Sequence, residues 1–194
     1  MKKRSMLFLA VSVIMVGACA SQNAHNDISS IVAAGKVQGN QYENAYFGLT
    51  IVAGDADIQA PAAVNVKGRQ ARLIQIISRS RIWDNIYTFA ILADSRANYP
   101  PGQSVTEYVR NFRHRLEGEG LQTIKEEFPV VMSGVSFTEA ILREGTKGDR
   151  PHVRAILSTS RNEYMLTFDV EAPTEERLQQ LISSMIKWKA KSQP

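Results

Sequence analysis

The chain has 194 residues, 44% of them hydrophobic, which suits one domain large enough to bury its own core. It carries 23 Lys and Arg against 19 Asp and Glu, but residues 1–18 hold three of the basic residues and none of the acidic ones. The remainder has 20 basic against 19 acidic residues, and this near balance does not support a nucleic-acid-binding protein, which needs a strong basic excess.

Residues 1–18 have the form of a secretory signal peptide. Lys2, Lys3 and Arg4 precede an uncharged apolar run of 11 residues, from Met6 to Val16. A membrane-spanning helix needs about 20 apolar residues, so this run is too short to cross a bilayer. A charged start followed by a short apolar run is typical of an export signal, and we therefore predict export.

The only cysteine, Cys19, follows Val16, Gly17 and Ala18, and this sequence resembles the lipobox of bacterial lipoproteins. The resemblance implies a diacylglyceryl thioether on Cys19, cleavage before this residue and acylation of the new amino group. Several chains are needed for durable anchoring, because one acyl chain alone holds only marginally. An ordinary signal peptidase could instead cut after Ala20, which would remove the cysteine. Since Ala20 and not aspartate follows the cysteine, the predicted place is the outer membrane of the cell envelope, facing the periplasm.

Residues 19–40 are mostly small and polar, and they predict a flexible tether. Such a segment has an end-to-end distance of about 25 Å, enough to lift a domain off the bilayer. Its apolar patch, Ile31 to Ala34, could alternatively form a short helix that docks on the domain. The folded domain is expected over residues 41–190.

The first half of that domain predicts two strands and two helices. A capping box at Ser104 and Glu107 marks the start of the clearest helix, which ends at Gly118. Residues 62–78 fit a helical face, although "RLIQII" equally suits a buried strand. The expected elements are a strand over 46–52 with a short strand before it, a helix over 62–78, a strand over 85–94 and a helix over 105–117.

The second half predicts a meander of strands followed by a helix. Tyr164 to Glu171 alternates apolar and polar residues, with Met165, Thr167 and Asp169 expected to face outward. The last helix begins at Pro173 and Thr174, and its buried stripe extends to Trp188. The expected strands are 121–125, 135–143, 152–158 and 164–171, with a less certain segment at 129–133 and a hairpin turn at 160–163. The predicted class is α+β, with a mostly antiparallel sheet covered by helices.

From about residue 40 to 190 the chain resembles the PsbP-like proteins, which are α/β/α sandwiches. "QYENAYFGLTI" (41–51) is similar to their Tyr-x-Asn-x-x-Phe-Gly opening, and "EYMLTFDVEAPTEERLQQLISSMIKWK" (163–189) is similar to their closing strand and helix. Pro61 lacks the tryptophan of the Pro-x-x-Trp found in many bacterial members. The resemblance implies a fold used for docking onto other proteins, as in the extrinsic subunit of photosystem II, without a common active site.

No catalytic, cofactor-binding or metal site is predicted. The sequence has no Gly-x-Ser-x-Gly and no phosphate-binding glycine loop, and its histidines (His25, His114 and His152) lack the spacing of metal ligands. Asp55 and Asp57 suggest a calcium loop, but the central glycine and later acidic ligand of such a loop are missing.

One face of the 105–117 helix carries Arg110, Arg113 and Arg115, and it is the candidate interaction face. It would meet anionic headgroups or an acidic partner. The alternative is a solvated face balanced by neighbouring glutamates. Together these features predict a non-catalytic, lipid-anchored accessory or docking module of an envelope protein complex; the alternative is a periplasmic carrier or sensor of a small ligand or metal.

Overall fold

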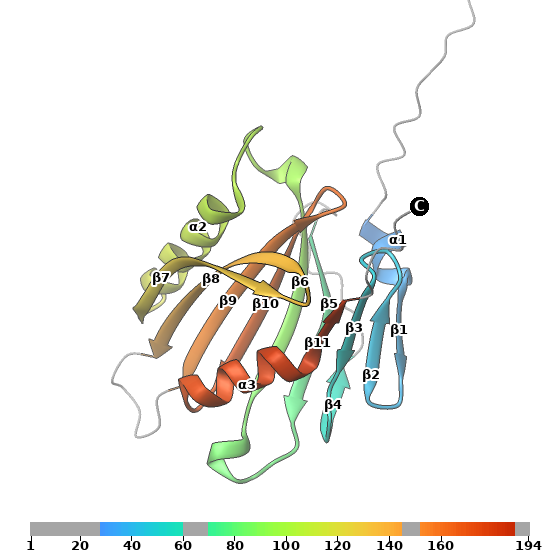
Figure 1. The fold of residues 1–194 in the computed structure, drawn as a ribbon, viewed down its shortest axis with the longest axis vertical. Coiled ribbons are helices and arrows are strands. Elements are labelled where there is room, and N and C mark those ends of the chain that lie inside the picture. Colours follow the sequence, from blue (N-terminus) through green and yellow to red (C-terminus); the bar gives the residue numbers. More distant parts are fainter. Residues whose placement is uncertain (1–27, 60–69, 145–151, 189–194) are drawn as a thin grey trace, which may run out of the picture.

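The computed structural model describes residues 28–59, 70–144 and 152–188, and in these ranges the chain forms two antiparallel sheets and three α-helices (Figure 1). None of the described helices is long and apolar enough to cross a bilayer. The helices are α1 (Ile28–Ala33), α2 (Val105–Gly118) and α3 (Glu175–Met185). The strands are β1 (Gly35–Gln38), β2 (Gln41–Asn44), β3 (Leu49–Val52), β4 (Ala56–Gln59), β5 (Gln70–Ser78), β6 (Thr88–Ser95), β7 (Leu121–Met132), β8 (Val135–Glu144), β9 (Val153–Arg161), β10 (Tyr164–Ala172) and β11 (Ile186–Trp188).

The larger sheet has seven strands in the order β4-β5-β6-β10-β9-β8-β7, and every neighbouring pair is antiparallel. The predicted meander is therefore confirmed as β7 to β10. Its last hairpin turns at Asn162 and Glu163, which have φ angles of 48° and 66°. Positive φ at both turn residues is the geometry that matches the twist of a two-residue hairpin.

Both faces of this sheet are buried, because α2 and α3 cover opposite sides. Phe137, Leu157 and Phe168 face α3, whereas Ala140, Ile156 and Met165 face α2. Successive strand residues point to opposite faces, so a single strand contributes to both cores. Met165 and Thr167 lie on the opposite face of the sheet from Phe168, but the prediction that this face points outward was wrong. It lies under α2, and both side chains are buried.

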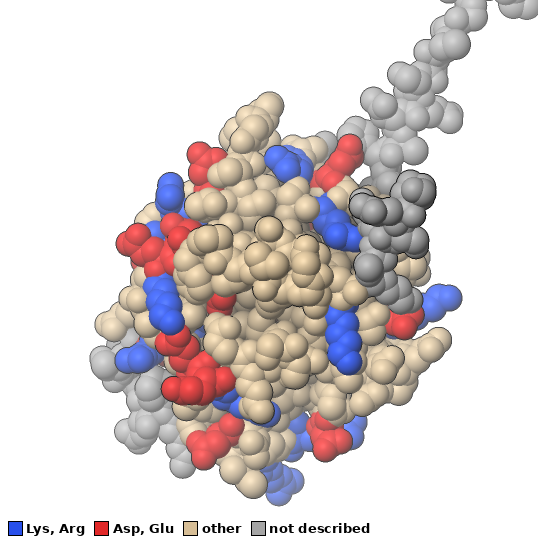
Figure 2. All heavy atoms as spheres, in the orientation of Figure 1, with Lys and Arg blue, Asp and Glu red and all other residues tan. Residues whose placement is uncertain are grey.

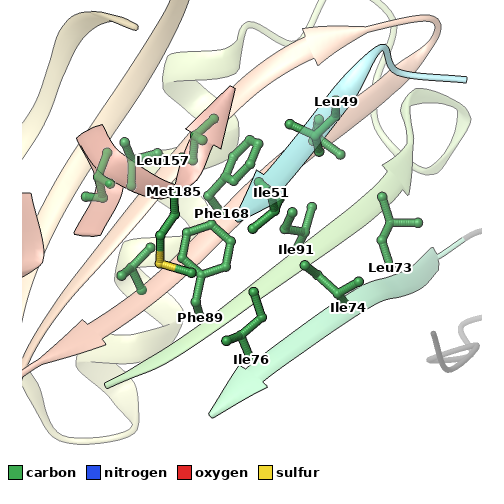
Figure 3. Packing of buried hydrophobic residues seen from close by; sticks show 14 of the residues in the cluster. Leu49, Ile51, Leu73, Ile74, Ile76, Phe89, Ile91, Leu157, Phe168 and Met185 are labelled. Carbon is green, nitrogen blue, oxygen red and sulfur yellow. The ribbon is translucent and has the colours of Figure 1, made fainter. Parts of the chain in front are cut away.

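The smaller sheet has the order β1-β2-β3-β11 and packs on the α3 side of the larger sheet. Figure 3 shows Leu49 and Ile51 of β3 turned toward Ile91 of β6 in one continuous apolar cluster. Burying apolar surface stabilises the fold by about 25 cal/mol per Å². The α+β class with an antiparallel sheet covered by helices is confirmed, but a second sheet was not predicted.

The predicted helix over 62–78 is wrong for the part that the structure describes, which is strand β5. The register with β6 shifts between Arg72 and Ile74, so two consecutive residues, Leu73 and Ile74, are both buried. Such a bulge interrupts strict alternation and leaves a pattern that resembles helical spacing. Residues 62–69 lie outside the described residues.

The prediction of a tether as far as residue 40 is also wrong from Ile28 onward. Ile28 and Ile31 of α1 are buried in the main core, and β1 pairs with β2. Burial of these two side chains favours order over a freely moving chain. The folded part therefore begins at or before Ile28; residues 19–27 and the signal peptide over 1–18 lie outside the described residues.

The last helix is shorter than predicted, because it ends at Met185. Ile186 has extended backbone angles and starts β11, which pairs with β3. Trp188 belongs to this strand, and its ring lies 6.0 Å from that of Phe137 and 6.2 Å from that of Phe168. Pairing with β3 makes β11 the fourth strand of the small sheet.

Candidate functional site

The predicted interaction face on α2 is divided by the structure. Arg113 is buried and donates to Glu127 at 2.6 Å and to Glu117 at 2.7 Å, while Arg110 lies 3.3 Å from Glu127. Burial alone would raise the pKa of Glu127, but hydrogen bonds from Arg113 and Arg110 outweigh it and hold that pKa below its ordinary value. Hydrogen bonds from Thr123 and His114 lower the pKa of Glu117 to about 2.

Arg115 is separate from this network. Its guanidinium lies 4.1 Å from the centre of the Phe112 ring and lines a cavity of about 130 Å³ beside Asp94. Only Arg110 and Arg115 of the three arginines are therefore at the surface. Binding of a partner to this face remains a prediction, now with two exposed cations instead of three.

Asp94 is a buried carboxylate with a full set of donors. It accepts hydrogen bonds from Tyr99 Oη, from Asn98 Nδ2 at 2.6 Å and from Gln70 Nε2 at 3.2 Å. Burial raises the pKa of Asp94, and these hydrogen bonds partly offset the rise. A buried acid satisfied in this way has a structural role in joining β5, β6 and the loop before α2.

Within the described ranges, the histidines and acidic residues singled out in the sequence lie apart from one another. His114 pairs with Glu117 at 2.8 Å, and His152 lies against the ring of Trp83 with 4.6 Å between ring centres. Asp57 pairs with Arg79 at 2.5 Å. Over residues 28–59, 70–144 and 152–188, no three His, Cys, Asp or Glu side chains are grouped to hold a metal ion, while His25 and Cys19 lie outside those ranges.

The Tyr-x-Asn-x-x-Phe-Gly motif also has a structural role. The buried Asn44 amide donates to Ile31 O and to Tyr42 Oη, both at 3.0 Å, and Asn44 Oδ1 accepts from Phe47 N at 3.3 Å. Gly48 follows with a φ of +64°, which is strained for other residues. The predicted strand over 46–52 therefore starts only at Leu49, since this turn occupies the preceding residues.

A groove lies between three segments that are far apart in the sequence: the β3–β4 turn, the β5–β6 hairpin and α3. It encloses a cavity of about 660 Å³. We call it the hairpin groove. Its lining comprises Val52, Ala53, Gly54, Asp55, Ser78, Arg79, Ser80, Asn85, Tyr87, Arg177, Gln180, Leu181, Ser184 and Met185.

The groove combines an apolar floor with a few polar groups. Met185 lies beside Phe89 of the core (Figure 3), and Tyr87 donates from its hydroxyl to Ala53 O at 2.9 Å. Burial raises the pKa of Tyr87, so its hydroxyl stays protonated and remains a donor. Arg177 lies 5.9 Å from the Tyr87 ring and donates to Gln180 Oε1 at 2.7 Å.

The tip of the β5–β6 hairpin forms one wall of the groove and is held by two serines. Ser78 Oγ donates to Asn85 O at 2.8 Å, and Ser80 Oγ accepts from Ile82 N at 3.1 Å. The side chain of Ile82 is exposed, with 65% of its surface accessible, and Trp83 is half-buried against His152. In Figure 1 this hairpin lies at the opposite end of the molecule from α1.

Sequence reasoning missed this groove, because none of its lining residues forms a motif by itself. The one available signal was the segment "SRSRIWDN" (78–85), where serines that hydrogen-bond the nearby backbone precede two large apolar side chains. Charges elsewhere give no stronger candidate on the face in view: Figure 2 shows Lys, Arg, Asp and Glu interspersed around its edge, and a largely uncharged centre.

Comparison with known proteins gives fold neighbours only. No protein-family model and no curated protein matches the sequence. The chain is similar in structure to the cyanobacterial PsbP of Synechocystis sp. PCC 6803, with 14% identity, coverage of 81% of this chain and 99% of that one, and a TM-score of 0.47. It is also similar to the Ran-binding protein Mog1p of Saccharomyces cerevisiae, with 10% identity, coverage of 77% and 82%, and a TM-score of 0.43.

Both likenesses concern the fold alone. Both TM-scores are below 0.5, so the function of neither protein transfers to this chain. The fold class follows from the sheet order and the two helical layers themselves.

Proposed function

We propose that this protein is a lipid-anchored, non-catalytic docking module of the cell envelope, and that a segment of its protein partner occupies the hairpin groove. The groove itself carries the proposal: about 660 Å³ of space is bounded by the β3–β4 turn, the β5–β6 hairpin and α3, and the exposed Ile82 lies at the tip of that hairpin. Grooves of this volume that combine apolar and polar lining groups are typical of binding sites.

The groove residues favour binding over catalysis. Its ionisable side chains are Asp55, Arg79, Tyr87 and Arg177. Arg79 is paired with Asp57, and Tyr87 donates to a backbone carbonyl, so neither stands beside a nucleophile as a general base would.

Site-specific crosslinking in cells tests the docking role. A photo-reactive amino acid at Gln180, which lines the groove, should give one discrete protein adduct. The matched control is the same amino acid at Glu126, an exposed residue of β7 on the far edge of the large sheet. Equal adducts from both positions, or none from Gln180, would contradict docking at the groove.

The lipid anchor rests on the sequence around Cys19. Mass spectrometry of the mature protein should find an acylated N-terminal Cys19, and Cys19→Ser should release the protein from the membrane fraction. An unmodified mature N-terminus at Ser21 would instead establish ordinary signal cleavage and overturn this part of the proposal.

The volume of the groove favours a second candidate, a carrier of a small polar ligand. Small-molecule sites span roughly 300–1,000 Å³, and this cavity lies in that range. A carrier would show ligand-dependent thermal stabilisation by a low-molecular-weight cell extract and no protein adduct at Gln180. A protein adduct at Gln180 without such stabilisation would favour docking.

A further inference from the structure

The hairpin groove contains a cation that has no acidic partner in the described part of the chain. Arg177 donates from Nη1 to Gln180, but its Nε is fully buried and meets no acceptor there. Arg79, Arg113 and Arg154 have carboxylate partners, whereas Arg72 and Arg161 also have a buried Nε without an acceptor in the described ranges but lie outside the groove lining. A guanidinium that lines a groove and has no carboxylate partner keeps N–H donors for an acceptor that enters the groove.

We infer that the groove recognises a carboxylate, and that the docking segment presents a Glu or Asp side chain to the guanidinium of Arg177. This inference rests on the proposed docking function and names the chemistry of the partner. Guanidinium groups bind carboxylates through two parallel hydrogen bonds, which gives both strength and orientation.

The surroundings of Arg177 favour an anion at this position. Arg177 is the third residue of α3, and its backbone N–H donates to the N-cap Thr174. The amino-terminal end of a helix carries partial positive charge, so Arg177 adds a full charge where the field is already positive. Of the two glutamates in this first turn, Glu175 is paired with Lys125 and Glu176 is exposed, and neither lines the groove.

Asp55 lies in the same groove on the β3–β4 turn, and it sets the orientation of the bound segment. Asp55 and Arg177 both line the groove together with Tyr87, whose ring centre lies 5.9 Å from the Arg177 guanidinium. Like-charge repulsion keeps a bound carboxylate away from Asp55. A backbone N–H of the same segment could instead donate a hydrogen bond to the Asp55 carboxylate. A peptide offers both groups, which suits a groove lined by Arg177 and Asp55, in which the second cation, Arg79, is already paired with Asp57.

The test uses two fluorescein-labelled capped peptides, Gly-Ser-Glu-Leu-Gly and its Gln counterpart, titrated with the full-length chain in detergent and followed by anisotropy. A charge-assisted bidentate contact predicts binding of the Glu peptide at least about tenfold more tightly than the Gln peptide. Arg177→Gln should abolish that difference, and Arg177→Lys should restore only part of it. The matched control is Arg81→Gln, an exposed arginine of the same hairpin outside the groove lining, which should leave it unchanged.

Equal affinity of both peptides, no binding of either, or full retention of the preference in Arg177→Gln would overturn the inference. Binding of free glutarate without binding of the Glu peptide would also overturn it, because the occupant would then be a small acid. The proposed docking function is decided separately by the crosslink at Gln180, so a groove that binds a partner through other contacts would still give that adduct.

Discussion

Two arginines on the two helices that cover the large sheet have opposite environments. Arg113 of α2 is buried between Glu117 and Glu127, and its charge is neutralised inside the fold. Arg177 of α3 lines an open groove and has no carboxylate partner in the described ranges. The same residue type therefore holds the structure together on one side and remains available for a ligand on the other. A cluster of basic residues in a sequence does not by itself distinguish these roles.

The largest expected effect is on the α2 side. Arg113→Gln leaves Glu127, whose side chain is 4% exposed, with Arg110 as its remaining cation. Removing one partner of a buried ion pair leaves the other charge uncompensated, so the free energy of unfolding should fall by about 3 kcal/mol. Urea denaturation measures the loss. Arg110→Gln is the control and should cost less than about 1 kcal/mol, because Arg110 is half-exposed; equal losses would contradict the assignment of Arg113 as the central cation.

The second prediction concerns acid stability on the same side. The pKa of Glu117 is about 2 in the folded protein, below its ordinary value of 4.5. The unfolded chain therefore binds more protons between these values, and the contribution of Glu117 to stability is present above about pH 5 and is lost as the pH falls toward 2. Glu117→Gln should flatten the fall in midpoint temperature over this range; an unchanged acid profile would contradict the prediction.

A buried glutamate on the α3 side should show the opposite sign. Glu139 of β8 lies under α3 and accepts from Gln179 Nε2 at 2.7 Å. Burial raises its pKa, so the folded state disfavours the charged form, and lowering the pH through the raised pKa should add stability. Glu139→Gln keeps an acceptor for Gln179 and should hold or raise the midpoint temperature at pH 7. A clear loss in this variant would show that the charged form is needed.

The smallest expected effect is on the stability of Arg177→Gln. Since this arginine makes no ion pair in the described ranges, its replacement should change the free energy of unfolding by no more than about 0.5 kcal/mol. Urea denaturation beside Arg113→Gln gives the direct comparison. A loss as large as that of Arg113→Gln would place both arginines in the same structural role.

Short sequence patterns correctly predicted those elements that depend on interactions between residues close together in the chain. The capping box at Ser104 and Glu107 correctly placed the start of α2, because its two hydrogen bonds form within one helical turn. The alternation in Tyr164 to Glu171 correctly identified β10, since side chains of a strand point to its two faces in turn. The same alternation could not show that both faces are covered.

The candidate site could not be predicted in this way. Nothing near Arg177 in the sequence distinguishes it from Arg113, because each is followed by polar and apolar residues at helical spacing. The difference arises from β7, where the register shift between Lys125 and Phe128 accompanies the contact of Glu127 with Arg113. No corresponding carboxylate reaches Arg177 from the described neighbours of α3.

The sequence alone determined the helix caps, the strand alternation and the α+β class, which follow from residues close together in the chain, while export and acylation around Cys19 stay predictions. The tertiary structure decided that residues 70–78 form a strand, that Ile186 to Trp188 join the small sheet, and that 28–38 belong to the fold. It also formed the hairpin groove from the β3–β4 turn, the β5–β6 hairpin and α3. These outcomes depend on partners distant in the sequence, whose burial and hydrogen bonds outweigh local preference.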